Sequence, residues 1–231
     1  MLTGWFGTLS AVLLAPHCLV CGEPGHDGLD LCADCRAALP WSHDACRQCG
    51  LPLSGPASRC GQCVFAPPPV TLTQAALHYA FPVDRLLPRF KFHGDLAAGA
   101  LLATLMQWAL DPAEFPQLLI PVPLHPTRLR QRGYDQALEL ATALSRECGL
   151  PLCRDRLVRL RATDAQSELG ASARQGNVRG AFGLRAGAPL PAHVALVDDV
   201  MTTGATVGEC ARTLLAAGVQ RVDVWAVARA L

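Results

Sequence analysis

Two adjacent acids end an apolar run in the stretch HVALVDDVMTTGATV, residues 193–207. A turn of small side chains at the start of a helix offers free backbone N–H groups and hydroxyls to an anion, most often a phosphate. Carboxylates repel phosphate but accept hydrogen bonds from the hydroxyls of a sugar. The stretch therefore predicts a ribose 5-phosphate site, and a chance strand, turn and helix is the alternative. Its residues are Asp198, Asp199, Val200, Met201, Thr202, Thr203, Gly204, Ala205 and Thr206.

Eight of the eleven cysteines form four C-x-x-C pairs, and each pair starts fourteen residues after the one before. A C-x-x-C turn lets two thiolates point at one ion, and two such turns complete a tetrahedral four-thiolate Zn²⁺ site. The pairs therefore predict two structural zinc ions with no open position for catalysis. The expected ligands are Cys18, Cys21, Cys32, Cys35, Cys46, Cys49, Cys60 and Cys63.

A longer period of twenty-eight residues relates CLVCGEP at position 18 to CRQCGLP at position 46. This period favours two tandem zinc ribbons, the first pair with the second and the third with the fourth. Equal spacing also fits an interleaved cross-brace, and a disulfide framework is the weaker alternative because the rest of the chain is typical of an intracellular protein. Three nearby histidines could substitute as ligands, and the other cysteines are expected as small buried residues. These are His17, His26 and His43, and Cys148, Cys153 and Cys210.

The composition predicts a packed protein of near-neutral charge. Hydrophobic residues make up 51% of the 231 residues, charged residues make up 17%, and the formal net charge is +1. This balance argues against a polycation that coats nucleic acid by charge alone. No segment has the run of apolar residues that spans a bilayer, and the apolar N-terminal stretch lacks the basic region of a signal peptide. We expect a cytoplasmic protein.

The segments after the cysteine pairs alternate between strand-like and helix-like patterns. Strands are expected near Leu72 and over 117–123, 193–200 and 221–231, and helices over 82–92, 96–110, 134–149 and 206–218. This alternation predicts an α/β fold with a parallel sheet covered on both faces, which binds ligands at the carboxyl ends of its strands. The proline-rich stretch 66–70 predicts a hinge between an N-terminal segment with ribbons, 1–65, and the α/β domain, 66–231.

Two resemblances extend this interpretation. VALVDDVMTTGAT is similar, across thirteen positions, to the phosphoribosyl pyrophosphate signature of type I phosphoribosyltransferases. The resemblance implies that Asp198 and Asp199 hold the ribose 2′- and 3′-hydroxyls and that the turn 202–206 holds the 5′-phosphate. With the cysteine pairs in front, IPVPLHPTRLRQRGYDQALELA and QSELGASARQGNVRGAF resemble the ComF family of competence-associated, phosphoribosyltransferase-like proteins over nearly the whole chain.

The arginine-rich loop PVPLHPTRLRQR follows a predicted strand, so we expect it at the ligand edge of the sheet. Its guanidinium groups could bind pyrophosphate oxygens, while at least one arginine belongs to a solvated turn; we favour Arg128 and Arg132 over Arg130. The backbone after Val122 and Pro123 could supply further N–H donors. His125 is expected to pack in the loop rather than to act as a general base.

Two further features follow from the ComF resemblance, and a third follows from the composition of one stretch. Lys91, the only lysine, matches the family's K-F motif and is expected either at phosphate or as a helix cap. The family's R-G-F-N-Q is R-G-Y-D-Q here, which leaves the role of Asp135 open. A polar, turn-rich stretch is expected to form a mobile flap over substrate, with a plain surface loop as the alternative. The flap candidates are Gln166, Arg174 and Asn177.

The resemblance implies transfer of a phosphoribosyl group, with Asp198, Asp199, Arg128 and Arg132 as the catalytic candidates and Mg²⁺ arriving with the diphosphate. The acceptor is not readable from the sequence. A second hypothesis is a single-stranded-DNA-binding factor that works with competence-machinery proteins in DNA uptake, although the chain has few aromatic residues for stacking. A third is a phosphoribosyl pyrophosphate sensor without turnover.

Overall fold

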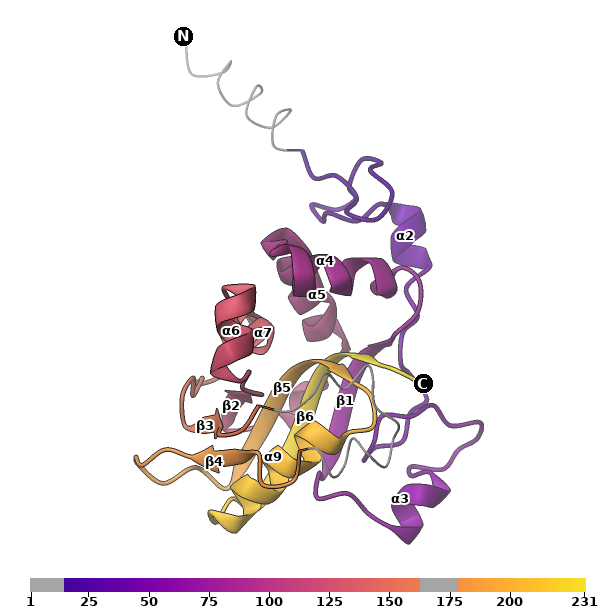
Figure 1. Ribbon diagram of the computed structural model, residues 1–231. Helices are drawn as coiled ribbons and strands as arrows, with labels where there is room; N and C mark the ends of the chain where they lie inside the picture. Colours follow the sequence, from indigo (N-terminus) through magenta and orange to yellow (C-terminus); the bar gives the residue numbers. More distant parts are fainter. Residues whose placement is uncertain (1–14, 163–177) are drawn as a thin grey trace.

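A four-stranded parallel sheet forms the centre of the computed structural model, which describes residues 15–162 and 178–231 (Figure 1). The strands lie in the order β1–β6–β5–β2, and all neighbouring pairs are parallel. The predicted parallel α/β sheet is therefore confirmed. The bounds are β1 (Leu72–His78), β6 (Arg221–Arg229), β5 (His193–Met201) and β2 (Leu118–Pro121).

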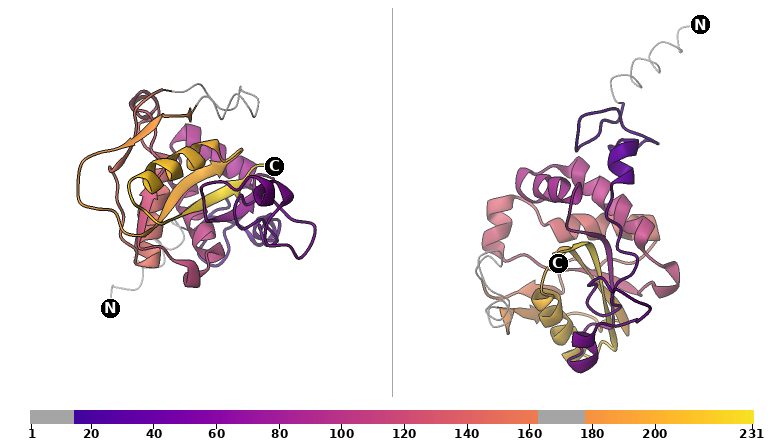
Figure 2. Two further views of the ribbon diagram at one scale, coloured as in Figure 1. Left: turned by 90° about the horizontal axis from the view of Figure 1, so that it is seen from below. Right: turned by 90° about the vertical axis from the view of Figure 1, so that its right-hand side faces the viewer.

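Strand β5 is almost continuously apolar because both of its faces are buried. Ala195 and Val197 join the core formed with α4, α5 and α7, whereas Val194 and Leu196 join the core under α9. Successive side chains of a strand point to opposite faces, so this division shows a sheet covered by helices on both sides (Figure 2). The helices are α4 (Val83–His93), α5 (Leu96–Ala109), α7 (Gln136–Cys148) and α9 (Ala205–Ala216).

The helix boundaries follow local capping signals. The carboxylate of Asp95 caps α5 by accepting the N–H of Ala98 at 3.0 Å. Gly149 ends α7 with a φ of 67°, in the left-handed region that glycine adopts without strain. Among the helices that the structure describes, none is long and apolar enough to cross a membrane.

The arginine-rich segment differs from the expected loop, because residues Pro126–Arg132 form a short helix, α6. His125 caps it, since its Nδ1 accepts the N–H of Thr127 at 3.3 Å. Pro126 occupies the first turn, where its missing N–H costs nothing, and Gly133 ends the helix with a φ of 80°. Three small elements were also not predicted: the 3₁₀ turn η1 (Pro112–Glu114) and the two strands of an antiparallel pair, β3 (Leu157–Arg159) and β4 (Phe182–Leu184).

The cysteine-rich region forms two separate ribbons, each with one short helix that follows its third cysteine: α2 (Ala33–Ala37) and α3 (Gly61–Phe65). The first ribbon lies against α4 and α5, where the Arg89 guanidinium donates to the carbonyl of Leu19 (Figure 1). The second ribbon lies beside β1 and β6. Thus each ribbon packs on its own part of the α/β unit.

The outer edge of β1 is covered by the chain that joins the ribbons. His78 donates its N–H to the carbonyl of Pro40 at 2.8 Å, and Ser42 donates to the carbonyl of Ala76 at 3.0 Å. Further along the edge, Thr73 donates to the carbonyl of Arg47 at 2.7 Å. These bonds satisfy backbone groups that an open edge strand would expose.

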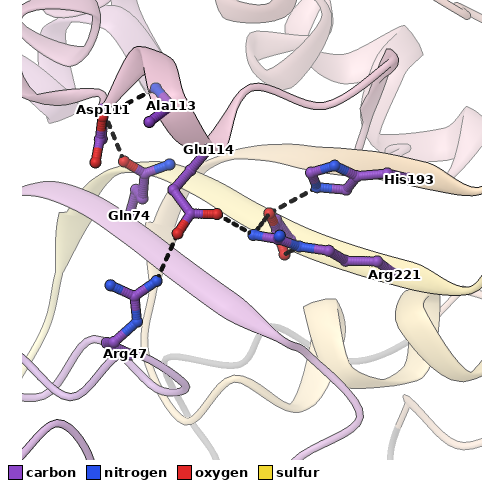
Figure 3. A network of polar contacts seen from close by, with 8 residues as sticks. Arg47, Gln74, Asp111, Ala113, Glu114, His193 and Arg221 are labelled. Atoms are coloured by element: carbon purple, nitrogen blue, oxygen red, sulfur yellow. Dashed lines mark hydrogen bonds and ion pairs between the residues drawn. The ribbon is translucent and has the colours of Figure 1, made fainter.

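An ionic network fastens the second ribbon to the amino-terminal ends of β5 and β6 (Figure 3). Asp223 is fully buried, and its carboxylate is held by Arg221 at 2.9 Å and by His193 at 2.8 Å. Glu114 then bridges Arg221 at 2.6 Å and Arg47 of the ribbon at 2.7 Å. The carboxyl-terminal ends of β5 and β6 lie on the opposite side of the sheet from this network, where all four strands end.

Candidate functional site

The eight paired cysteines gather into two tandem clusters, as the twenty-eight-residue period predicted. In each cluster the four sulfur atoms lie within 4.8 Å of one another. A tetrahedral ion with Zn–S bonds of 2.3 Å requires sulfur atoms about 3.8 Å apart. The Sγ atoms of Cys21 and Cys32 are 3.6 Å apart and those of Cys49 and Cys60 are 3.7 Å apart, so both clusters fit a structural Zn²⁺. The interleaved pairing is excluded, and the eleven cysteines, all within the described residues, form no disulfide.

Backbone groups prepare the first cysteine of each ribbon to ligate metal. Burial opposes ionisation of the Cys18 thiol, but donated N–H groups of Cys32, Cys21 and Val20 lower its pKa to about 6. The same balance lowers the pKa of Cys46 to about 6. Burial and the neighbouring sulfur atoms raise the pKa of Cys35 and Cys63 in the same clusters. Because zinc binds the thiolate form, metal binding must release protons from these two cysteines.

A cavity of about 500 Å³ opens where the strands β5, β2, β6 and β1 end. This is the edge at which parallel sheets bind ligands. The predicted residues that line it are Asp198, Asp199, Val200, Met201, Thr202, Gly204, Ala205, Thr206, Lys91, Val122, Pro123, Arg128 and Arg132. Thr203 instead faces the first turn of α9, where its hydroxyl accepts the N–H of Ala205 at 3.4 Å. The flap candidates Gln166, Arg174 and Asn177 lie outside the described residues.

The two acids occupy the floor of this cavity in different environments. Asp199 pairs with Lys91, whose Nζ lies 2.7 Å from its Oδ2. Burial, together with the neighbouring charge of Asp199, raises the pKa of Asp198 to about 8. One oxygen of each acid accepts a backbone N–H of the next residue, at 2.9 Å for Asp198 and 2.8 Å for Asp199. These bonds fix the orientation of both side chains at the cavity.

The turn between β5 and α9 requires a glycine at its end. Gly204 has a φ of 75° and is the N-cap of α9, without a side-chain cap of its own. A Cβ atom at this position would lie 2.9 Å from the Cε atom of Met201. The resulting close turn brings the first N–H groups of α9 to the cavity wall, where a helix N-terminus favours negative charge.

Helix α6 explains which arginines reach the cavity. Arg128 and Arg132 are four residues apart and therefore lie on one face of the helix, whereas Arg130 lies on the other side and is exposed. Arg132 donates to Oε1 of Gln136 at 2.8 Å and stacks over the ring of Phe92 at 5.4 Å. Burial lowers the pKa of Arg132.

Asp135 has a structural role in the backbone beside the cavity. One carboxylate oxygen caps α7 by accepting the N–H of Leu138 at 3.2 Å, and the other accepts the N–H of Leu124 at 3.2 Å. An asparagine has only one side-chain oxygen, so aspartate suits this double contact better. Asp135 thereby connects the loop after β2 to the start of α7.

Several residues that line the cavity were not predicted from the sequence. Tyr79 and Phe92 contribute exposed aromatic rings, and Arg159 enters from the small β3–β4 pair. A second space of about 440 Å³ shares four lining residues with the cavity and adds two more. The shared residues are Lys91, Phe92, Arg128 and Arg132, and the added ones are Gln131 and Tyr134. The position of Phe92 directly after Lys91, in a helix that contributes to the site, was the available signal for its role.

Comparison with known proteins agrees with both parts of the chain. A family model described as a double zinc ribbon domain matches residues 9–64. Competence protein F of Haemophilus influenzae is 36% identical over 208 residues, which cover 87% of this chain and 90% of that protein. DNA utilization protein YhgH of Salmonella typhimurium is 34% identical over 227 residues, covering 93% and 97%. Competence protein ComFC of Streptococcus pneumoniae is 26% identical over 230 residues, covering 92% and 99%.

Proposed function

The chain belongs to the family of Competence protein F, ComFC and YhgH, and on this premise we propose that its cavity binds phosphoribosyl pyrophosphate with Mg²⁺. One observation carries the proposal: two carboxylates, a helix N-terminus and two guanidinium groups converge on the same space of about 500 Å³. Such a set offers acceptors for a sugar and donors for phosphates at the two ends of one ligand.

The ribose phosphate half of the ligand fits the β5–α9 turn. Asp198 and Asp199 accept hydrogen bonds from the two ribose hydroxyls, and the N–H groups of residues 202–206 bind the 5′-phosphate. The Nζ atom of Lys91 lies 2.7 Å from the carboxylate of Asp199, and both residues line the cavity. A ligand bound to Asp199 therefore also comes within reach of Lys91, which can donate to the oxygens of the ligand.

The pyrophosphate half fits the opposite wall. Arg128 and Arg132 present planar donors from one face of α6, and the loop at Val122 and Pro123 adds backbone groups. Mg²⁺ enters largely with the diphosphate and keeps several of its waters, so few protein ligands are needed. In this proposal the residues Gln166, Arg174 and Asn177 belong to a flap over the bound ligand.

The reaction that this arrangement suits is phosphoribosyl transfer. The bond between the anomeric carbon and pyrophosphate breaks, pyrophosphate leaves with the electron pair, and an acceptor nucleophile bonds to the anomeric carbon. The arginines stabilise the charge of the leaving group, and the carboxylates hold the ribose, so the protein contributes chiefly position and electrostatics. Pyrophosphate release, screened over nucleobases and other amine acceptors, would identify the acceptor.

Calorimetric titration of phosphoribosyl pyrophosphate with Mg²⁺ tests the binding proposal. The variant Asp198→Asn/Asp199→Asn keeps the size of the side chains but replaces one oxygen of each by an amide NH₂ group, and we expect it to bind at least about tenfold more weakly. Asp155→Asn is the matched control, because Asp155 is exposed and is not among the cavity residues. Equal binding by the double variant and the wild type would refute the ribose assignment.

A second candidate function is the handling of single-stranded DNA during uptake, together with competence-machinery proteins. The exposed rings at the cavity, Tyr79 at 41% and Phe92 at 66% exposure, favour it, since bases stack on such rings beside arginines. In this alternative, phosphoribosyl pyrophosphate bound at the cavity regulates the affinity of the protein for single-stranded DNA.

Binding of labelled single-stranded DNA, measured against salt concentration, separates the candidates. If the exposed rings of Tyr79 and Phe92 bind DNA, Phe92→Ala weakens binding several-fold, and the affinity of the wild type for DNA falls steeply as the salt concentration rises. A flat salt dependence would mean that few phosphates are contacted and would argue against this function. Phosphoribosyl pyrophosphate that shifts DNA affinity without pyrophosphate release would support the sensor.

A further inference from the structure

Arg229, the last residue of β6, lies between the second ribbon and the β5–α9 turn. It is 5% exposed. Its Nε donates to the carbonyl of Cys49 at 2.8 Å, on the ribbon side. Its Nη1 donates to the carbonyl of Met201 at 3.1 Å and also contacts the carbonyl of Thr202, on the turn side. One buried guanidinium therefore joins a zinc-ligating residue to the proposed phosphate-binding turn.

On the ribbon side, three consecutive carbonyl groups of the third C-x-x-C turn face the α/β unit. The carbonyl of Arg47 accepts the N–H of Thr73 at 2.7 Å, and that of Gln48 accepts the Thr73 hydroxyl at 2.7 Å. The carbonyl of Cys49 is the third and accepts from Arg229. Because Cys46 and Cys49 would both ligate the zinc, the metal fixes the conformation of the turn between them. This conformation determines the direction of the three carbonyl groups.

On the other side, Arg229 orients peptide groups of the turn. In a trans peptide the N–H of a residue points away from the carbonyl of the residue before it. With the carbonyls of Met201 and Thr202 directed at Arg229, the N–H groups of Thr202 and Thr203 must point away from it. The N–H of Ala230 also binds the carbonyl of Met201, at 3.0 Å, which further restricts this peptide.

Charge favours the same connection. A Zn²⁺ ion held by four thiolates carries a net negative charge, and Arg229 is a nearby cation. The guanidinium is thus buried with an anionic cluster on one side and carbonyl acceptors on the other.

We propose that Arg229 is a positioning residue through which zinc at the second ribbon sets the conformation of residues 202–204, the start of the phosphate-binding turn. This rests on the proposed binding of phosphoribosyl pyrophosphate, but the effect on the turn itself is independent of that ligand. Loss of this zinc, by chelation or by oxidation of its cysteines, lowers affinity at a cavity to which the ion contributes no ligand.

The first test compares Arg229→Met, Arg229→Lys and Arg47→Met in the full, zinc-loaded chain. Arg47→Met is the matched control, because it removes the ion pair of the second ribbon with Glu114 but keeps the Arg47 carbonyl. The readouts are zinc content, amide hydrogen exchange at residues 202–204, and titration with phosphoribosyl pyrophosphate and Mg²⁺.

With two zinc ions retained, Arg229→Met should bind the ligand about tenfold more weakly and exchange faster at residues 202–204. Arg229→Lys should be intermediate, because one ammonium cannot reach both sides as a guanidinium does. Arg47→Met should match the wild type in both readouts. Unchanged exchange at these amides in zinc-loaded Arg229→Met would overturn the inference. If the wild type fails to bind phosphoribosyl pyrophosphate, the proposed function is refuted. The hydrogen-exchange measurement still tests whether Arg229 positions the turn.

The second test removes the metal instead of the arginine. Cys60→Ser should reduce zinc from two ions to one per chain and raise exchange at residues 202–204 as Arg229→Met does. If loss of zinc and loss of the arginine act through the same contacts, the double variant Cys60→Ser/Arg229→Met should exchange no faster at residues 202–204 than either single variant. Additive effects on exchange, or no effect of Cys60→Ser, would contradict the coupling.

Discussion

The Nζ atom of Lys91 lies 2.7 Å from Oδ2 of Asp199, so the only lysine of the chain connects helix α4 to strand β5 at the floor of the cavity. The side chains are 28% and 9% exposed, respectively. At this depth the pair is less screened than a surface ion pair. The cation also offsets the negative charge that Asp199 would otherwise direct at an anionic ligand.

Replacing this cation should weaken ligand binding. Without Lys91, the charge of Asp199 faces phosphoribosyl pyrophosphate uncompensated, and we expect Lys91→Met to raise the Kd about tenfold at pH 7. Lys91→Arg keeps a charged donor and should lose less. Calorimetric titration with Mg²⁺ gives both values, and an unchanged Kd for Lys91→Met would show that the lysine is only structural.

The raised pKa of Asp198 predicts a pH dependence of stability. In the folded chain its pKa is about 8, against an unperturbed value of 3.8. The folded state therefore holds the proton more tightly than the unfolded state, and its stability falls as pH rises from about 4 to about 8.

Asp198→Asn should remove much of this fall, because the amide remains neutral throughout. Its melting temperature should exceed that of the wild type at pH 8 by a few degrees and approach it at pH 5, while binding of phosphoribosyl pyrophosphate weakens. Thermal melts of both proteins, with exposed Asp155→Asn as control, measure the difference. Parallel pH profiles for Asp198→Asn and wild type would contradict the assignment.

The sequence predicted the elements whose signals are local. Strand β5 is an apolar run between polar ends, and α7 carries a capping aspartate and a terminal glycine. Helix α6 was missed because its arginines mask any apolar periodicity, although Pro126 at the first turn and Gly133 after the end are the usual boundary signals.

Contacts between distant segments were beyond prediction from one sequence. Lys91 and Asp199 meet only because α4 packs beside the end of β5, and Arg229 meets Cys49 across 180 residues of chain. Spacing along the chain carries no information on such pairs. The cations Lys91, Arg128 and Arg132 were predicted to lie with the motif at residues 198–206, whereas the pairing of Lys91 with Asp199 follows from the tertiary fold.

The two contacts of Asp135 predict a graded effect on stability. Asp135→Ala removes both the cap of α7 and the acceptor for the N–H of Leu124, and should destabilise the chain by about 1–2 kcal/mol. Asp135→Asn retains one oxygen and should cost less. Urea unfolding distinguishes the two. Equal losses in both variants would mean that the second oxygen contributes nothing.

The tandem clusters predict that each ribbon holds its metal independently. Cys21→Ser and Cys60→Ser should each reduce zinc from two ions to about one per chain, because each removes a ligand from only one cluster. Chelation of the remaining ion should lower the melting temperature further, since zinc binding stabilises the fold around it. Metal analysis of the purified variants gives the count, and a value near zero for either would show that the ribbons depend on each other.

The two faces of α6 predict which arginines bind the ligand and provide their own control. Arg128→Gln and Arg132→Gln should each weaken binding of phosphoribosyl pyrophosphate about tenfold or more, because each removes a charged donor to the diphosphate. Arg130→Gln removes the same charge from the exposed side of the same helix and should bind within about twofold of the wild type.

Single-stranded DNA should respond differently to the same three variants. Arginines on both sides of α6 can contact the phosphates of a DNA strand that lies along this helix. Each substitution, Arg130→Gln included, should therefore reduce the salt dependence of the DNA affinity by an amount equal to about one phosphate contact. Loss of DNA binding in Arg130→Gln with retained phosphoribosyl pyrophosphate binding would separate the two surfaces. If all three variants bind both ligands as the wild type does, neither function uses this helix.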